Sequence, residues 1–408
     1  MSTSIITTTC CIAGGGPAGM MLGFLLARAG VKVVVLEKHA DFLRDFRGDT
    51  IHPSTLELMH EIGLIEEFLK LPHSKVERLS GLIGETRVTI ADFSQLPTQC
   101  RFVAFMPQWD FLDFLADQGR RYPVFDLRMR AQATALIEED GRVAGLRATT
   151  PEGEIEIRAD LTVACDGRHS TLREAAGFKV DDIGAPMDIL WFRLSRKAGD
   201  AAETFGHIEA GRMMIMLDRG DYWQCAYVIP KGGFDDVKRG GLDAFRAIVA
   251  GMSPFVGDRV GEIASWDDVK LLTVAIDRLP RWHKPGLLCI GDAAHAMSPV
   301  GGVGVNLAIQ DAVAAANILW RPLRDGAASE ADVYAVQRRR EFPTRVTQRL
   351  QVFIQNNVIT AALKGGARPK PPFAVKLFDW FPVLRRIPAR LIGMGVRPEH
   401  VHTPAARP

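Results

Sequence analysis

The sequence lacks the features of several large classes of protein. No uninterrupted apolar run approaches the roughly 20 residues that a membrane span needs. The first residues contain no basic stretch followed by a hydrophobic segment, so we expect no signal peptide. The 50 Lys and Arg residues are nearly balanced by 48 Asp and Glu, and a formal charge of +2 argues against a nucleic-acid partner. These absences predict a cytoplasmic globular protein.

Cysteine is scarce and shows no chemical pattern. The six cysteines form no CxxC pair and have no metal-ligand spacing. Most lie in apolar, strand-like runs, where the expected state is the reduced, buried thiol of a cytoplasmic protein. The sequence therefore predicts no metal site. The six are Cys10, Cys11, Cys100, Cys165, Cys225 and Cys289.

The most informative stretch lies at the start of the chain, which at 408 residues is long enough for two domains. In residues 5–37 an apolar β-branched run, a glycine-rich turn, a helical pattern and a second apolar run follow one another. In such a unit Gly14 permits the turn, Gly16 lets a diphosphate approach the backbone, and Gly19 lets the helix pack on the strand. The pattern is typical of dinucleotide binding.

The helix start and an acidic residue complete this motif. The helix is expected to begin at Pro17 and Ala18, where free N–H groups and the helix dipole favour a diphosphate. Glu37 follows the turn at about the 20-residue separation at which a carboxylate binds a ribose hydroxyl. Lys38 is its neighbour. The motif predicts a bound dinucleotide without distinguishing FAD from NAD.

Two further motifs each follow a buried strand pattern. One is CDGRHSTLR at 165–173, and the other is GDAAHAMSPVGGVGVN at 291–306. Together with GGGPAG at 14–19 and Glu37, they resemble the FAD-dependent aromatic hydroxylases, the family of para-hydroxybenzoate hydroxylase. The resemblance runs from residue 5 to about 320, and the combination is more specific than any one motif.

The resemblance implies an α/β fold with α+β elements. Its parts would be a discontinuous Rossmann-like FAD-binding domain, an inserted mixed β-sheet domain for the substrate, and a C-terminal helical segment. The strand and helix patterns of the chain fit this order. The expected bounds are 1–75, 100–185 and 280–330 for the FAD domain, 76–99 and 186–279 for the substrate sheet, and 331–408 for the C-terminal helices.

The family also implies roles for individual residues. Arg47 would lie near the FAD ribose and diphosphate, and Gln108 near the ribityl-diphosphate region. Asp166 and Arg173 belong to a motif associated with both FAD and the nicotinamide cofactor. The third motif would supply Asp292 to the ribityl chain, Pro299 beside the flavin ring, and the backbone of Gly304, Val305 and Asn306 at the pyrimidine edge. A helix start aimed at that edge would stabilise the negative charge of the reduced flavin.

The implied activity is that of a monooxygenase. NAD(P)H would reduce a non-covalently bound FAD and leave, O₂ would form a C4a-hydroperoxide, and one oxygen atom would pass to an aromatic or conjugated substrate. The chain has no second glycine motif for NAD(P)H, which fits a transient reductant. Alternatives are an isoprenoid reductase-like or halogenase-like FAD enzyme without oxygen insertion, or a flavin-binding protein without turnover. The family leaves a monomer or a homodimer open.

The substrate cavity is expected between strands of the inserted sheet. Candidate lining residues are Trp191, Arg193, Met214, Met216, Trp223 and Tyr227, with Pro299, Arg193 and Tyr227 as flavin-adjacent candidates and no catalytic residue identified. Trp223 and Tyr227 should share one face of a strand, either in the pocket or in the core. Because both faces are mostly apolar, we expect a hydrophobic, polycyclic or alkyl-substituted aromatic substrate. His295 and His52 are interpreted as structural residues.

Overall fold

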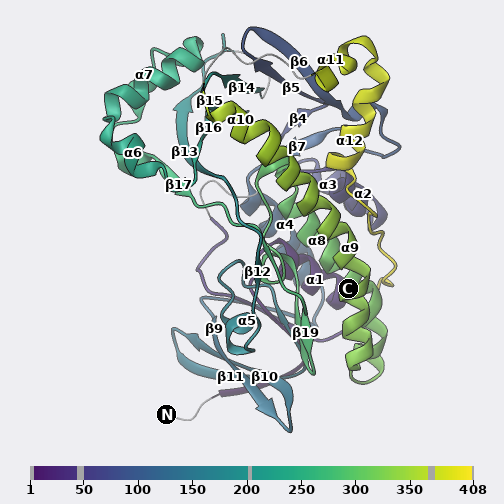
Figure 1. The fold of residues 1–408 in the computed structure, drawn as a ribbon. Helices are drawn as coiled ribbons and strands as arrows, with labels where there is room; N and C mark the ends of the chain where they lie inside the picture. Colours follow the sequence, from purple (N-terminus) through teal and green to yellow (C-terminus); the bar gives the residue numbers. More distant parts are fainter. Residues whose placement is uncertain (1–3, 44–49, 201–204, 366–372, 407–408) are drawn as a thin grey trace.

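The computed structural model describes residues 4–43, 50–200, 205–365 and 373–406. Arg47, predicted to lie near the FAD ribose, falls outside these residues. The described chain forms two large sheets with helices on their faces (Figure 1). The mixed α/β architecture predicted from the sequence is therefore confirmed.

The first large sheet contains the predicted N-terminal unit. Strand β1 (Ser4–Ala13), helix α1 (Pro17–Arg28) and strand β2 (Val33–Glu37) follow one another, and every residue of β2 is buried. Around them the strand order is β19-β20-β11-β1-β2-β8, with parallel pairing from β20 to β8. The added strands are β8 (Phe125–Met129), β11 (Gly153–Ala164), β19 (His283–Lys284) and β20 (Leu287–Cys289).

The middle of this sheet differs from the sequence reading. The sequence pattern from 124 to 159 indicates a run of antiparallel strands, but β8 pairs in parallel with β2 instead. The sequence pattern also indicates two separate strands at 154–159 and 161–165, but the structure has one long strand, β11, which pairs with β10 along its first half and with β1 along its length. Only β9 (Gln132–Glu139), β10 (Arg142–Thr150) and the start of β11 form the meander.

The second large sheet joins segments that are far apart in the sequence. Its strand order is β17-β13-β16-β15-β14-β5-β6, and β5 enters it by pairing in parallel with β14. Residues 78–92 thus share a sheet with residues 187–272. The strands are β5 (Arg78–Ile83), β6 (Thr86–Asp92), β13 (Met187–Ser195), β14 (Phe205–Glu209), β15 (Arg212–Asp218), β16 (Tyr222–Pro230) and β17 (Lys270–Leu272).

One face of the second sheet is covered by helices α6 (Phe234–Arg239) and α7 (Leu242–Met252). Phe245 of α7 makes edge contacts with Tyr227 and Phe192, at ring-centroid distances of 5.6 and 5.5 Å. Four predicted pocket residues lie in this core: Met214, Met216, Trp223 and Tyr227. They fill the space between sheet and helices, so the structure does not place them in an open pocket.

The opposite face carries the other two pocket candidates. Trp191 pairs with Ala226, so its side chain projects away from the face that holds Tyr227. Arg193 lies on the same face as Trp191, with its guanidinium carbon 4.8 Å from the centroid of the Tyr222 ring. This face also packs against Val300, in the loop that precedes α8. It is therefore turned toward the third sequence motif.

Smaller elements connect the two sheets. A three-stranded sheet is formed by β3 (Thr50–Ile51), β7 (Val103–Phe105) and β4 (Ser74–Val76). The remaining helices of the first half of the chain are α2 (Pro53–Glu61), α3 (Ile65–Phe68), α4 (Gln108–Arg120) and α5 (Thr171–Ala175).

The C-terminal helices contact both large sheets. Helix α9 (Glu330–Ile354) packs on α8 (Gly304–Asp325), and a π-helical turn at Gln355–Ile359 continues it into α10 (Thr360–Leu363), which lies against β15 and β16 (Figure 1). Helices α11 (Phe373–Trp380) and α12 (Arg386–Gly393) pack on β6. One helical stretch, Val300–Asp325, is long and apolar enough to cross a membrane, but 67% of its apolar window is buried inside the fold, as in a core helix.

The core assignment of Tyr227 can be tested by truncation. Tyr227→Ala should lower the free energy of unfolding by about 3–5 kcal/mol, because it removes a ring packed against Phe245. Urea denaturation followed by circular dichroism measures the change. Trp191→Ala, on the half-buried opposite face, is the matched control and should lose clearly less. Equal losses for the two variants would contradict the assignment.

Candidate flavin site

The three sequence motifs meet at one edge of the first sheet. Strands β1, β2, β11 and β20 are parallel, so their carboxyl ends lie together. Backbone hydrogen bonds connect them there, from Cys165 N to Ala13 O at 2.7 Å and from Ile290 N to Ala164 O at 3.1 Å. In open α/β sheets the ligand crevice lies outside these ends.

The glycine turn has the geometry of a diphosphate cradle. Gly14 has φ +104°, and a Cβ there would lie 2.3 Å from Cys165 O. A Cβ on Gly19 would lie 1.9 Å from Gly14 O, so only glycine lets α1 pack this closely. A Cβ on Gly16 would meet nothing within 4 Å. The open space beside Gly16, at the start of α1, is where the motif requires a ligand. The residues present therefore fit the diphosphate of a dinucleotide.

Glu37 lies at the end of β2 and is 9% exposed. One carboxylate oxygen accepts a hydrogen bond from Gly15 N at 3.1 Å. The other accepts one from His39 N at 3.0 Å and lies 2.5 Å from His39 Nδ1. The carboxylate is thus held against the glycine turn, and His39 is a neighbour that the sequence analysis missed. Lys38, between them, is exposed.

The second motif forms a tight loop after β11. The carboxylate of Asp166 accepts hydrogen bonds from Ser170 Oγ and from Leu172 N, and burial raises its pKa. Arg173 donates to Arg168 O at 2.6 Å and to Ala293 O at 3.3 Å. Asp166 therefore shapes its own loop, while Arg173 fastens that loop to the third motif.

The third motif begins between two helices. Gly291 has φ +59°, and a Cβ there would lie 3.2 Å from the Cβ atoms of Ala18 in α1 and Ala308 in α8. The next residue, Asp292, is partly exposed, with a carboxylate oxygen 4.0 Å from a guanidinium nitrogen of Arg168. Asp292 thus follows a residue that packs on the start of α1, and its contact with the ribityl chain stays a prediction.

The start of α8 is fixed by the side chain of Asn306. Its Oδ1 accepts hydrogen bonds from His52 N at 2.9 Å and from Thr55 Oγ1 at 2.8 Å, and its Nδ2 donates to Thr50 O at 3.0 Å. This connection joins the helix start to β3 and α2. The backbone at Gly304 and Val305 opens α8, where we predicted the pyrimidine edge.

Both histidines that were interpreted as structural are buried. His295 Nε2 lies 2.6 Å from Asp311 Oδ2, and Arg340 Nε donates to Asp311 Oδ1 at 3.0 Å. Although burial raises the pKa of Asp311, these two partners lower it below its usual value. Burial also lowers the pKa of His52 to about 4, so it is neutral at pH 7 and donates from Nδ1 to Ile392 O at 2.7 Å.

Helix α9 supplies residues that the sequence analysis missed. A stripe of six polar side chains, each at most 5% exposed, lies on one face of the helix and continues into the π-helical turn. Four of them are glutamines: three bind the backbone of residues 277–300 through their amides, and the fourth donates to the hydroxyl of Ser298. The signal was present in the sequence as a polar pattern with helical spacing. The stripe consists of Gln337, Arg340, Thr344, Gln348, Gln351 and Gln355.

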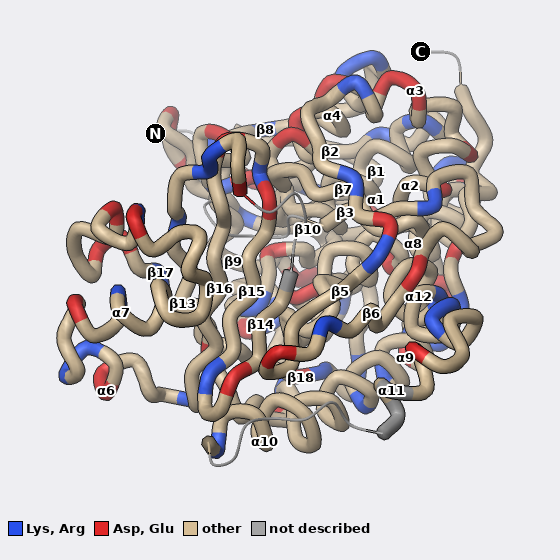
Figure 2. The backbone as a smooth tube through the Cα atoms, turned by 90° about the horizontal axis from the view of Figure 1, so that it is seen from above, with Lys and Arg blue, Asp and Glu red and all other residues tan. Residues whose placement is uncertain are grey.

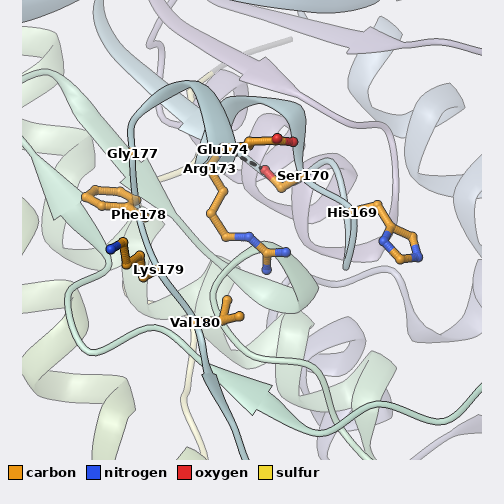
Figure 3. Close-up of a pocket in the computed structure, with 8 residues that line it drawn as sticks. All are labelled: His169, Ser170, Arg173, Glu174, Gly177, Phe178, Lys179 and Val180. Atoms are coloured by element: carbon orange, nitrogen blue, oxygen red, sulfur yellow. Dashed lines mark hydrogen bonds between the residues drawn. The ribbon is translucent and has the colours of Figure 1, made fainter.

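A pocket of about 430 Å³ opens beside the Asp-Gly loop (Figure 3). The guanidinium of Arg173 points toward its centre, with Phe178 and Lys179 on one side and His169 on the other. Gln108 does not line this pocket; it lies at the half-buried start of α4, and its place near the ribityl-diphosphate region stays a prediction. The pocket combines cationic groups with an aromatic ring.

A family model described as an FAD binding domain matches residues 7–350. The chain belongs to this family, the FAD-dependent aromatic hydroxylases. It is 32% identical over 386 residues to 6-methylpretetramide 4-monooxygenase of Streptomyces rimosus, covering 93% of this chain and 92% of that protein. It is 24% identical to para-nitrophenol 4-monooxygenase of a Pseudomonas species, covering 81% and 82%.

A solved structure shares the fold. The crystal structure of PqsL, a probable FAD-dependent monooxygenase from Pseudomonas aeruginosa, matches with a TM-score of 0.74 at 19% identity, covering 88% of this chain and 98% of that one. The predicted fold is thereby confirmed. With the family match and the named relatives, the chain is an FAD-dependent monooxygenase of the aromatic hydroxylase type.

The flavin cradle can be tested with two glycine substitutions in the same turn. Gly19→Ala should lower the free energy of unfolding by about 3 kcal/mol, because its methyl group would overlap Gly14 O. Gly16→Ala should keep the stability of the apoprotein, since its methyl meets no protein atom, yet raise the FAD dissociation constant at least about tenfold. Urea denaturation and fluorescence titration measure the two effects. Unchanged FAD affinity in Gly16→Ala would contradict the cradle.

Proposed function

We propose that this enzyme uses non-covalent FAD, NAD(P)H and O₂ to hydroxylate a bulky, apolar, polycyclic aromatic substrate. The observation that carries the proposal is that the third motif spans the two sheets: it begins at Gly291 beside α1 and reaches one face of the second sheet at Val300. FAD, when bound there, supplies the redox and oxygen-transfer chemistry. The chain positions the two reactants and excludes water.

The substrate is proposed to lie on the sheet face opposite α7. Along that face Trp191, Ala226 and Ile215 pair across three neighbouring strands, and Gly206 continues the row. The row combines an aromatic ring, an apolar Ile215 and the small residues Ala226 and Gly206, which suits a flat, extended ring system. Arg193 is the nearby cation, but it is exposed and packs on Tyr222. A carboxylate buried on this face would therefore be poorly compensated.

The relatives support the same substrate class. The relative with 32% identity over almost the whole chain is named for a polycyclic substrate, 6-methylpretetramide, whereas the relative named for the small para-nitrophenol is 24% identical. The functions named for these relatives also favour oxygen insertion over a reductase-like or halogenase-like reaction, and over a flavin-binding protein without turnover. An analogue of 6-methylpretetramide that keeps its fused aromatic rings is the first substrate to test.

The reductant is proposed to approach through the pocket beside the Asp-Gly loop. Lys179 and Arg173 would face its diphosphate, and Phe178 would offer a surface for a ring. Arg173 already binds two backbone carbonyls, which leaves Lys179 as the residue to vary. A pocket that lies outside the glycine turn would let the reductant leave while FAD stays bound.

The cofactor and the reaction can be tested together. The purified protein should carry about one FAD per chain and release FAD, not FMN, on denaturation. Fused-ring phenols should stimulate NAD(P)H oxidation and give a product heavier by one oxygen atom, measured by mass spectrometry. Better coupled turnover with para-hydroxybenzoate or salicylate, abolished by Arg193→Ala, would contradict the apolar substrate. NAD(P)H oxidation that never yields an oxygenated product would contradict monooxygenation.

The reductant pocket has its own test. Lys179→Ala should raise the KM for NAD(P)H about threefold to tenfold, because a charge-assisted contact with phosphate is lost, and leave kcat nearly unchanged. Steady-state kinetics at saturating aromatic substrate measures both constants. Lys179→Arg, which keeps the charge, should retain most of the affinity. If the KM is the same in all three proteins, the reductant binds elsewhere.

A further inference from the structure

The loop that carries Pro299 is held by one side chain of α9. Gln351 Oε1 accepts a hydrogen bond from Ser298 N at 3.2 Å, and Gln351 Nε2 donates to Ser298 O at 2.8 Å and to Val300 O at 2.9 Å. A single amide thus binds the backbone on both sides of Pro299. Ser298 is 1% exposed, whereas Pro299 and Val300 are half-buried. Gln351 fixes the inner side of the loop, and the outer side is left to face a ligand.

The two neighbouring glutamines extend this support along the loop. Gln348 Nε2 donates to Ala296 O at 3.1 Å and to Asp277 O at 2.8 Å. Gln355 Nε2 donates to Ser298 Oγ at 2.6 Å, from the first residue of the π-helical turn. The amides are 1%, 3% and 0% exposed at positions 348, 351 and 355, so water does not compete for these bonds. Side chains of α9 and of the π-helical turn thus hold the loop at Ala296, Ser298 and Val300.

The same stretch of helix meets the substrate face of the second sheet. Ile359, at the end of the π-helical turn, packs with Met187 and Val228 of that sheet, and Val300 joins this cluster. The loop at Pro299 is therefore enclosed between the polar stripe of α9 and the face proposed for the substrate. A shift of the loop would move the predicted flavin-ring neighbour relative to the substrate.

We propose that Gln351 is a positioning residue that, with Gln348 and Gln355, sets the place of the Pro299 loop against the flavin ring and thereby the coupling of NAD(P)H oxidation to hydroxylation. The inference rests on the proposed function. It assigns the role to side chains that act on the flavin ring only through their hydrogen bonds to the loop: Gln348 and Gln351 to its backbone, and Gln355 to the Ser298 hydroxyl.

The experiment compares two glutamines of the same stripe. Gln351→Leu removes the three bonds to the Pro299 loop. Gln337→Leu is the matched control, because Gln337 is also buried, on the same helix face, and binds backbone at Trp282 N and Pro280 O, away from that loop. Both holoproteins are examined by visible absorption of the bound flavin, by FAD titration, and by the fraction of consumed NAD(P)H recovered as H₂O₂.

Both variants should show a lower melting temperature, because each loses backbone hydrogen bonds in a buried site. Only Gln351→Leu should shift the flavin absorption band, and its fraction of H₂O₂ should rise at least about threefold. Gln351→Asn, whose amide is too short to reach both carbonyls, should shift the band in the same direction. An unchanged spectrum in Gln351→Leu, or an equal spectral shift in Gln337→Leu, would overturn the proposal.

The proposed function and the positioning role of Gln351 are contradicted by different results. If the wild-type protein binds FAD but forms no oxygenated product, the proposed function fails while the spectral comparison still tests the position of the loop. If the wild-type protein hydroxylates its substrate and Gln351→Leu keeps both the spectrum and the H₂O₂ fraction, only the positioning role fails.

Discussion

The close packing of α1 on the glycine turn is the constraint on which the flavin site depends. Gly19 lies so close to Gly14 O that no side chain fits between them, and Gly14 likewise leaves no room for a side chain beside Cys165 O. These contacts fix the helix start relative to β1 and β11. Gly291 is placed by the same helix, since Ala18 bounds it on one side. The three motifs therefore share one geometry, although about 275 residues separate the first from the last.

Much of this site could be predicted because its signals are local. Glycines with positive φ, a helix start and an acid after the second strand each depend on a few neighbouring residues, and the structure has β1, α1 and β2 where the pattern places them. The substrate face was harder. Strand alternation separates Trp191 from Tyr227, but only tertiary packing decides which of the two faces α7 covers. That information lies in tertiary packing, not in strand period.

The polar stripe of α9 shows a second limit of sequence patterns. A helix face with glutamines at helical spacing normally indicates a solvated surface, and its mean hydropathy gives no sign of burial. Here the face is buried because the segment 277–300 has few regular backbone partners of its own. The amides supply the backbone hydrogen bonds that strand pairing supplies elsewhere.

Figure 2 shows that acidic and basic residues are mixed over the molecule, in agreement with the near-neutral net charge.

The order of strands in the first sheet has a consequence for synthesis of the chain. β1, β2 and β11 come from the first 164 residues, but their neighbour β20 begins only at Leu287, and α8, which bounds Gly291, ends at Asp325. A ribosome must therefore complete every strand of the inserted sheet before β19 and β20 exist. Until then the end of β11 that pairs with β20, residues 162–164, lacks that partner. The nascent chain closes its cofactor site late, when all strands of the substrate sheet have been synthesised.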